Sequence, residues 1–174
     1  MKKAITIRET ALFAIMGAVL VSVDFALDFL PSIELVTSLI IAFSVVYRWK
    51  ALLPTILYVI ILHMFIYGFT FWMIAFLFIY PLFCIITVLI SKHISIKAGY
   101  VVYPLLSAFF GLSFGTLCMP AQMIAFSLSW KQSLTWISAG LTFDIAHSVG
   151  NLFAGLLIVP TIILLRKISK WTNY

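Results

Sequence analysis

Long apolar stretches separated by short basic segments restrict the possible folds of this chain more than any other feature. A helix needs about 20 largely apolar residues to cross a bilayer. Six segments meet this requirement: 9–29, 33–48, 51–68, 71–91, 98–125 and 134–166. The second is short, and the sixth is long enough to tilt or to begin outside the bilayer. Only 9% of the 174 residues are charged, against about 25% in a soluble domain. The sequence therefore predicts an all-α integral membrane protein, with residues 1–174 forming one bundle of six transmembrane helices.

The basic residues predict the orientation of this bundle, because cytoplasmic loops of membrane proteins are enriched in lysine and arginine. The N-terminal basic residues and apolar run resemble a signal peptide, but no small-residue cleavage site follows, so we expect a retained first helix. With six spans, every basic residue except Lys131 falls on the same side as the two termini. Both termini are therefore predicted to be cytoplasmic. The net charge of +6 thus follows from topology and does not indicate a nucleic-acid partner.

Four of the five acidic residues gather toward the external side: Asp24, Asp28, Glu34 and Asp144. Outer loops tolerate acidic residues, and we prefer that explanation for Asp28. Asp24 and Asp144 are embedded in apolar sequence, where a charge costs several kcal/mol unless it faces a partner or a cavity.

A polar stripe marks the sixth segment. Asp144, His147, Ser148 and Asn151 recur at spacings that share one helix face. The stripe can be an interhelical hydrogen-bond cluster or the wall of an externally accessible pocket, and we favour the pocket because intramembrane ionisable residues are functional candidates by default. A metal site would need at least three ligands, and none is close in sequence, so no metal is predicted.

Aromatic residues mark one face of the fourth segment. Trp72, Phe76 and Tyr80 recur every four residues, and Pro81 can kink the helix beside Tyr80. Such stripes often face lipid or the core, or anchor the helix at the interface. An aromatic platform beside a polar stripe also suits a flat, hydrogen-bonding heterocycle.

Small residues form a face in the cytoplasmic half of the first segment. Ala11, Ala14, Gly17 and Ala18 lie on it, and Ala14 and Ala18 form an AxxxA pair. Such faces allow close approach of another helix, either within the bundle or from another subunit.

The sequence contains no motif for catalysis or cofactor binding: GxSxG, HExxH and the Walker-type GxxxxGK[ST] are all absent. We therefore predict no catalytic residues and no cofactor. The polar stripe and the aromatic face together favour a binding pocket. Two alternatives stay open, a membrane-embedded enzyme using Asp144 and His147 as acid and base, and a scaffold in which the stripe only joins helices.

Several segments together resemble the substrate-binding (S) components of energy-coupling factor vitamin transporters: ETALFAIMGAVL (9–20), PSIELVTSLI (31–40), YPL (80–82), GLSFGTLC (111–118) and FDIAHSVGN (143–151). The resemblance covers nearly the whole chain. It implies a multi-pass protein of a prokaryotic plasma membrane that captures a vitamin or related micronutrient from outside. It also implies docking, through Ala14 and Ala18, on a membrane T component bound to two ATP-binding subunits that hydrolyse the ATP.

The same resemblance implies ligand contacts from the outer halves of the helices: Glu34, Trp72, Tyr80, Asp144, His147 and Asn151. The external side is rich in acids and poor in bases, which disfavours a strongly anionic ligand. We expect a neutral or weakly cationic heterocycle. Cobalamin stays open, and pantothenate ranks lower because its carboxylate would need a basic partner.

Overall fold

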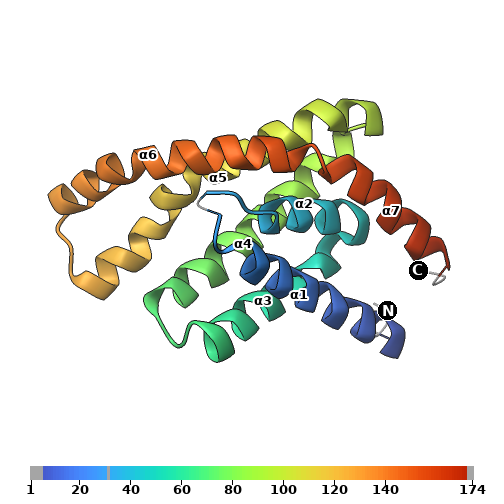
Figure 1. The fold of residues 1–174 in the computed structure, drawn as a ribbon, viewed down its shortest axis with the longest axis horizontal. Helices are drawn as coiled ribbons and strands as arrows, with labels where there is room; N and C mark the ends of the chain where they lie inside the picture. The colour runs from blue at the N-terminus through green and yellow to red at the C-terminus, as the bar shows by residue number, and fades with distance from the viewer. Residues whose placement is uncertain (1–5, 31, 172–174) are drawn as a thin grey trace.

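The computed structural model of the chain describes residues 6–30 and 32–171. These residues are almost entirely helical and contain no β-strand. The main helices are α1 (Ile7–Leu27), α2 (Val36–Tyr47), α3 (Leu52–Ile61), α4 (Phe71–Ile90), α5 (Ile96–Phe126), α6 (Trp130–Gly155) and α7 (Ile158–Trp171) (Figure 1). Short irregular turns follow α2, α3 and α4: η1 (Arg48–Ala51), the π-helical η2 (Leu62–Ile66) and η3 (Ser91–His93). The predicted all-α fold is confirmed.

Each predicted apolar segment is helical, but the helices are not all long enough to cross a membrane. Four stretches have the required length and apolar character, Ile7–Leu27, Val36–Ile66, Phe71–His93 and Ile96–Phe126. The predicted segments 33–48 and 51–68 correspond to α2 and to α3 with η2, both within the second stretch. The predicted sixth segment is a pair of helices, α6 and α7, bent by 47° at their junction. Counting that pair as one span gives five.

The bend between α6 and α7 has a local cause. Leu156 and Leu157 form tight turns, with hydrogen bonds from their N–H groups to the carbonyls of Phe153 and Ala154. Pro160 follows, and a proline has no N–H to donate to the carbonyl four residues earlier. The helical hydrogen-bond ladder is therefore interrupted just where the axis changes direction.

Helix starts follow ordinary capping chemistry. Thr6 caps α1 by accepting from the N–H of Glu9, whose carboxylate in turn accepts from the N–H of Thr6. Ser129 and Gln132 form the same reciprocal arrangement at the start of α6. The start of α1 and the end of α7 lie at the same end of the molecule (Figure 1). This agrees with termini on one side of a membrane, while the cytoplasmic identity of that side stays a prediction from the charges.

The short helix α2 lies at the centre of the core. Ten of its 12 residues are buried, and it packs mainly against α4 and α7. A buried stacked pair, Phe83 of α4 and Phe110 of α5, lies in the same core, with ring centroids 4.0 Å apart. Arg48 follows α2 with a positive φ of 57° and donates hydrogen bonds to Ser91 Oγ and the Val88 carbonyl, each 2.7 Å long. This arginine therefore joins the end of α2 to the end of α4.

Candidate functional site

A cavity of about 480 Å³ lies where the α1–α2 loop, the end of α3 and the start of α4 meet α5 and α6. Small-molecule sites commonly have volumes of about 300–1,000 Å³. Four of the residues predicted as ligand contacts line it: Glu34, Trp72, Tyr80 and His147. Eight others line it as well: Asp24, Asp28, Leu62, His63, Tyr67, Thr70, Phe76 and Phe114. Residues from four α-helices, the π-helical turn η2 and two connections, far apart in sequence, thus meet around one space.

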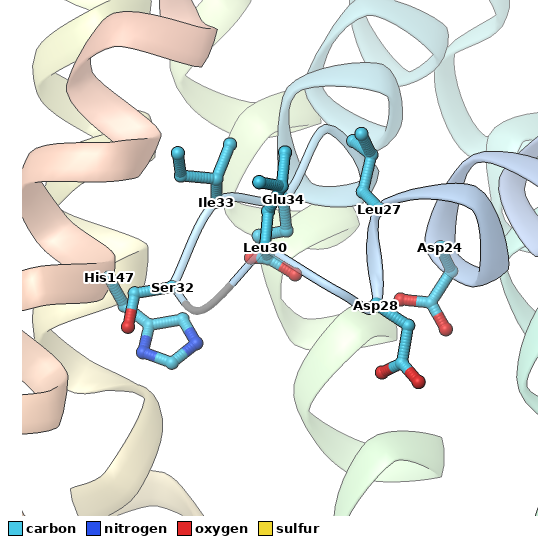
Figure 2. Close-up of a pocket in the computed structure, with 8 residues that line it drawn as sticks. All are labelled: Asp24, Leu27, Asp28, Leu30, Ser32, Ile33, Glu34 and His147. Atoms are coloured by element: carbon cyan, nitrogen blue, oxygen red, sulfur yellow. The ribbon is translucent and has the colours of Figure 1, made fainter.

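A smaller cavity of about 200 Å³ adjoins the first one. Asp24, Asp28, Glu34 and His147 line both cavities, and the remaining walls of the smaller one come from the loop between α1 and α2. Figure 2 shows the three carboxylates and the imidazole ring projecting to the same side of this loop. These four ionisable side chains therefore form the boundary that the two cavities share.

Glu34 is fixed in place by hydrogen bonds from two other elements. Its Oε1 accepts from Thr37 Oγ1 at 2.7 Å and from Asn151 Nδ2 at 3.3 Å. Neither bond uses Oε2. Residues of α2 and α6 thus hold Oε1 in place, and Glu34 lines both cavities.

Asp24 and Asp28 are separated by one turn at the end of α1, so both project from the same side of that helix. The sequence interpretation treated Asp28 as an acid that an outer loop merely tolerates. Asp28 is exposed at the end of α1, as that interpretation allows, and it also lines both cavities together with Asp24 and Glu34. The four-residue spacing between Asp24 and Asp28 was the sequence feature that could have indicated that both acids face the same space.

The aromatic face predicted for α4 is continuous. The Phe76 ring lies 6.0 Å from the Trp72 ring and 5.3 Å from the Tyr80 ring, measured between centroids. Phe114 of α5 extends this surface, with its centroid 5.5 Å from that of Phe76. Tyr80 is buried and Trp72 is partly exposed, so the aromatic wall runs from the rim of the cavity to its floor.

His63 lines the cavity as well, although it was not among the predicted ligand contacts. It lies in the π-helical turn η2 and is 2% exposed. Its ring packs edge-on against Phe76, with centroids 5.1 Å apart. Neither ring nitrogen has a hydrogen-bond partner. A histidine within an otherwise apolar segment was the signal that could have identified it.

Tyr67 and Thr70 complete the cavity wall beside His63. Burial raises the pKa of the Tyr67 hydroxyl, and the nearby carboxylates of Asp24 and Asp28 act in the same direction. The hydroxyl therefore stays protonated at neutral pH and can both donate and accept a hydrogen bond. The Thr70 hydroxyl is buried without a partner.

The polar stripe on α6 divides between two surroundings. His147 lines the cavity, and its Nδ1 lies 3.0 Å from the Phe143 carbonyl oxygen. Asp144 and Asn151 are buried and do not line either cavity. Asp144 Oδ1 accepts the N–H of Gly115 on α5 at 3.1 Å. Asp144 thus makes an interhelical hydrogen bond, as expected if the stripe joins helices. Asn151 does not line the cavity but donates a hydrogen bond to Glu34, which does.

Glycines on α5 make room for these two side chains. A Cβ on Gly115 would lie 2.6 Å from both carboxylate oxygens of Asp144, and one on Gly111 would lie 2.9 Å from Asn151 Nδ2. The GLSFGTLC segment therefore contributes a close helix–helix contact.

The small-residue face of α1 is also divided. Gly17 is buried, and a Cβ there would meet the Leu57 side chain of α3 at 3.0 Å. Ala14 and Ala18 are exposed on the surface of the bundle. The AxxxA pair is therefore free of internal packing and accessible to another protein or to lipid.

Comparison of the chain with known protein families, with curated proteins and with solved structures gives no match. Among the described residues, no group of three or more His, Cys, Asp or Glu side chains is arranged to hold a metal ion.

Proposed function

We propose that the chain is the S component of an energy-coupling factor importer, which binds a vitamin or related micronutrient and delivers it with the help of ATP-hydrolysing partner subunits. The observation that carries this proposal is the cavity of about 480 Å³, which combines three carboxylates, two histidines and a continuous aromatic wall. A flat heterocycle with polar substituents suits such a lining. The proposed ligand is neutral or weakly cationic, as the excess of acids favours.

The partners follow from the same proposal. A T component would receive the exposed Ala14 and Ala18 of α1, and two ATP-binding subunits would supply the energy. Ala14 and Ala18 lie in the first half and the middle of α1, whereas Asp24 and Asp28 lie at its C-terminal end. Ligand binding and partner docking would therefore use different parts of this helix.

The enzyme alternative has less support, because Asp144 and His147 are directed to different surroundings. Acid–base catalysis requires both groups within reach of one substrate, yet Asp144 is hydrogen-bonded to α5 and lies outside the cavity. The scaffold alternative accounts for Asp144 but leaves the cavity and its buried unpaired histidine unexplained.

Mass spectrometry of small molecules that co-purify with the detergent-solubilised chain tests the proposal. We expect one bound micronutrient per chain, recovered unchanged after incubation. Co-expression with a T component and the ATP-binding subunits should give a complex that contains the chain. Conversion of the bound molecule to a product would contradict the proposal, and so would a preparation that holds no small molecule and joins no such complex.

A further inference from the structure

The charges around the cavity are unbalanced. Asp24, Asp28 and Glu34 line it, whereas no lysine or arginine is present among the described residues of its wall. Like charges gathered in a partly dry space repel one another and are costly to desolvate without a counter-charge. Among the described residues that line this space, the basic side chains are those of His63 and His147.

Two of these acids lie at a helix end that adds further negative charge to the cavity. Asp24 lies in the last turn of α1, and Asp28 is its C-cap residue. The C-terminal end of a helix carries partial negative charge, so carboxylates are disfavoured there and cations are stabilised. A positively charged group between these carboxylates would be favoured by the side chains and by the helix end together.

Glu34 is already oriented for such a group. Thr37 and Asn151 both hydrogen-bond to its Oε1, which fixes the carboxylate plane and leaves Oε2 for a ligand. A preorganised acceptor binds a cation with less loss of side-chain freedom than a mobile one.

The aromatic wall favours the same charge. The faces of Trp72, Phe76 and Tyr80 carry negative electrostatic potential, which attracts cations and disfavours anions. Trp72 gives the strongest attraction of this kind and lies partly exposed beside the acids. A cationic ring could stack on this wall and keep its charge near the carboxylates.

His63 defines a second point of recognition. It is buried and lines the cavity, and both of its ring nitrogens lack a partner. A buried polar group without a hydrogen bond is costly, and a neutral imidazole offers one donor and one acceptor. Its edge contact with Phe76 holds the ring in place, so a polar ligand atom reaching this depth would satisfy it.

We infer that the cavity selects a flat nitrogen heterocycle with a positive charge at one end and a hydrogen-bonding polar group at the other. The charge lies among Asp24, Asp28 and Glu34, the ring stacks on the aromatic wall of α4, and the polar group reaches His63. This inference rests on the proposed function, because it assumes that the cavity holds a ligand. It narrows the expected ligand from a neutral or weakly cationic heterocycle to a cationic one.

Three pyridine probes that differ mainly in charge test this inference: nicotinamide, its ring-N-methylated cation, and nicotinate. The full chain in nanodiscs is titrated with each probe, and binding is followed by tryptophan fluorescence and calorimetry. We expect the cation to bind at least about tenfold more tightly than nicotinamide, which corresponds to about 1.4 kcal/mol, and nicotinate to bind most weakly.

Variants assign the effect to the proposed groups. Glu34→Gln should reduce the preference for the cation to less than about threefold with little change for nicotinamide. Asp28→Asn tests the same point at an exposed position that should not affect folding. His63→Phe keeps a ring against Phe76 and should weaken both amides alike, leaving their ratio unchanged. Lys131→Gln, at an exposed position that lines neither cavity, serves as the matched control.

Equal or tighter binding of nicotinamide would overturn the inference, as would failure of both amides to bind, or a preference for the cation that persists in both carboxylate variants. These outcomes are distinct from failure of the proposed function. If a neutral micronutrient co-purified with the chain in a complex with the T component, the inference of a cationic ligand would be wrong and the proposed function would stand. If the chain clearly preferred the cation but joined no importer, the proposed function would be wrong and the inference of a cationic ligand would stand.

Discussion

Replacing Gly115 with alanine should destabilise the protein by separating α5 from α6. The new Cβ would lie 2.6 Å from both oxygens of Asp144, so the helices must move apart, and this movement also breaks or weakens the hydrogen bond from the Gly115 N–H to Asp144. Overpacking costs about 1–3 kcal/mol, and a hydrogen bond to a charged acceptor contributes about 1.5–3 kcal/mol. The higher helix propensity of alanine returns at most about 1 kcal/mol. We expect a net loss of about 2–4 kcal/mol.

Thermal unfolding in detergent, followed by the helical circular dichroism signal, measures this loss. A change of 1 kcal/mol shifts Tm by about 2–4 °C in chains of 150–250 residues, so Tm should fall by about 5–15 °C. Gly140→Ala is the matched control, because a Cβ on Gly140 has no atom within 4 Å. That variant should be as stable as the parent protein or slightly more stable.

A second substitution tests the assigned cause. In an Asp144→Ala background the carboxylate is gone, so adding Gly115→Ala should cost much less than it does alone. If Gly115→Ala and Gly140→Ala had the same Tm, or if the cost were unchanged without Asp144, the close α5–α6 contact would be refuted.

The remaining predictions concern docking, the α2–α4 connection and ligand orientation. Ala14→Trp should abolish co-purification with a T component and leave small-molecule binding unchanged, whereas Ala139→Trp, at an exposed position of α6, should affect neither. Arg48→Ala removes two hydrogen bonds to the end of α4 and should lower Tm by several degrees in the same unfolding assay. Lys50→Ala breaks a partly buried ion pair with Glu9 and should lower Tm less. Asn151→Ala removes one of the two bonds that orient Glu34 and should weaken binding of the co-purified ligand by about five- to tenfold in calorimetric titrations.

The helices were predictable because their signal is local. Long apolar runs bury well in a bilayer or a core, and each predicted segment is indeed helical. Their breaks were harder to predict. Arg48 has a positive φ, and its side chain donates hydrogen bonds to Ser91 Oγ and to the Val88 carbonyl. Both partners are distant in sequence, so local patterns do not indicate this contact. The bend near Pro160 was expected only as a tilt of one long helix.

The candidate site was predictable in part. Helical spacing placed Asp144, His147 and Asn151 on one face, but at about 100° per residue His147 lies roughly 60° around the axis from Asp144 and Asn151 only about 20°. α5 covers the Asp144 and Asn151 side of this face and leaves His147 facing the cavity. The position of a neighbouring helix decides this division, and helical spacing within α6 does not give that position.

His63 was missed for a related reason. The π-helical turn around it shifts the register of the following residues, so regular helical spacing gives no indication of which surface it faces. Trp72 and Tyr80 were identified because α4 keeps its helical register through this region.

Helix α1 carries acids at its C-terminal end and the exposed Ala14 and Ala18 in its first half and middle, and it is continuous from Ile7 to Leu27. At 1.5 Å per residue, Ala14 and Asp28 are about 21 Å apart along the axis. The helix has no break between Ala14 and Leu27, so we expect it to move as one rigid body. If a ligand displaces the acidic end, the alanine surface is displaced with it, and a partner docked there could distinguish a loaded chain from an empty one.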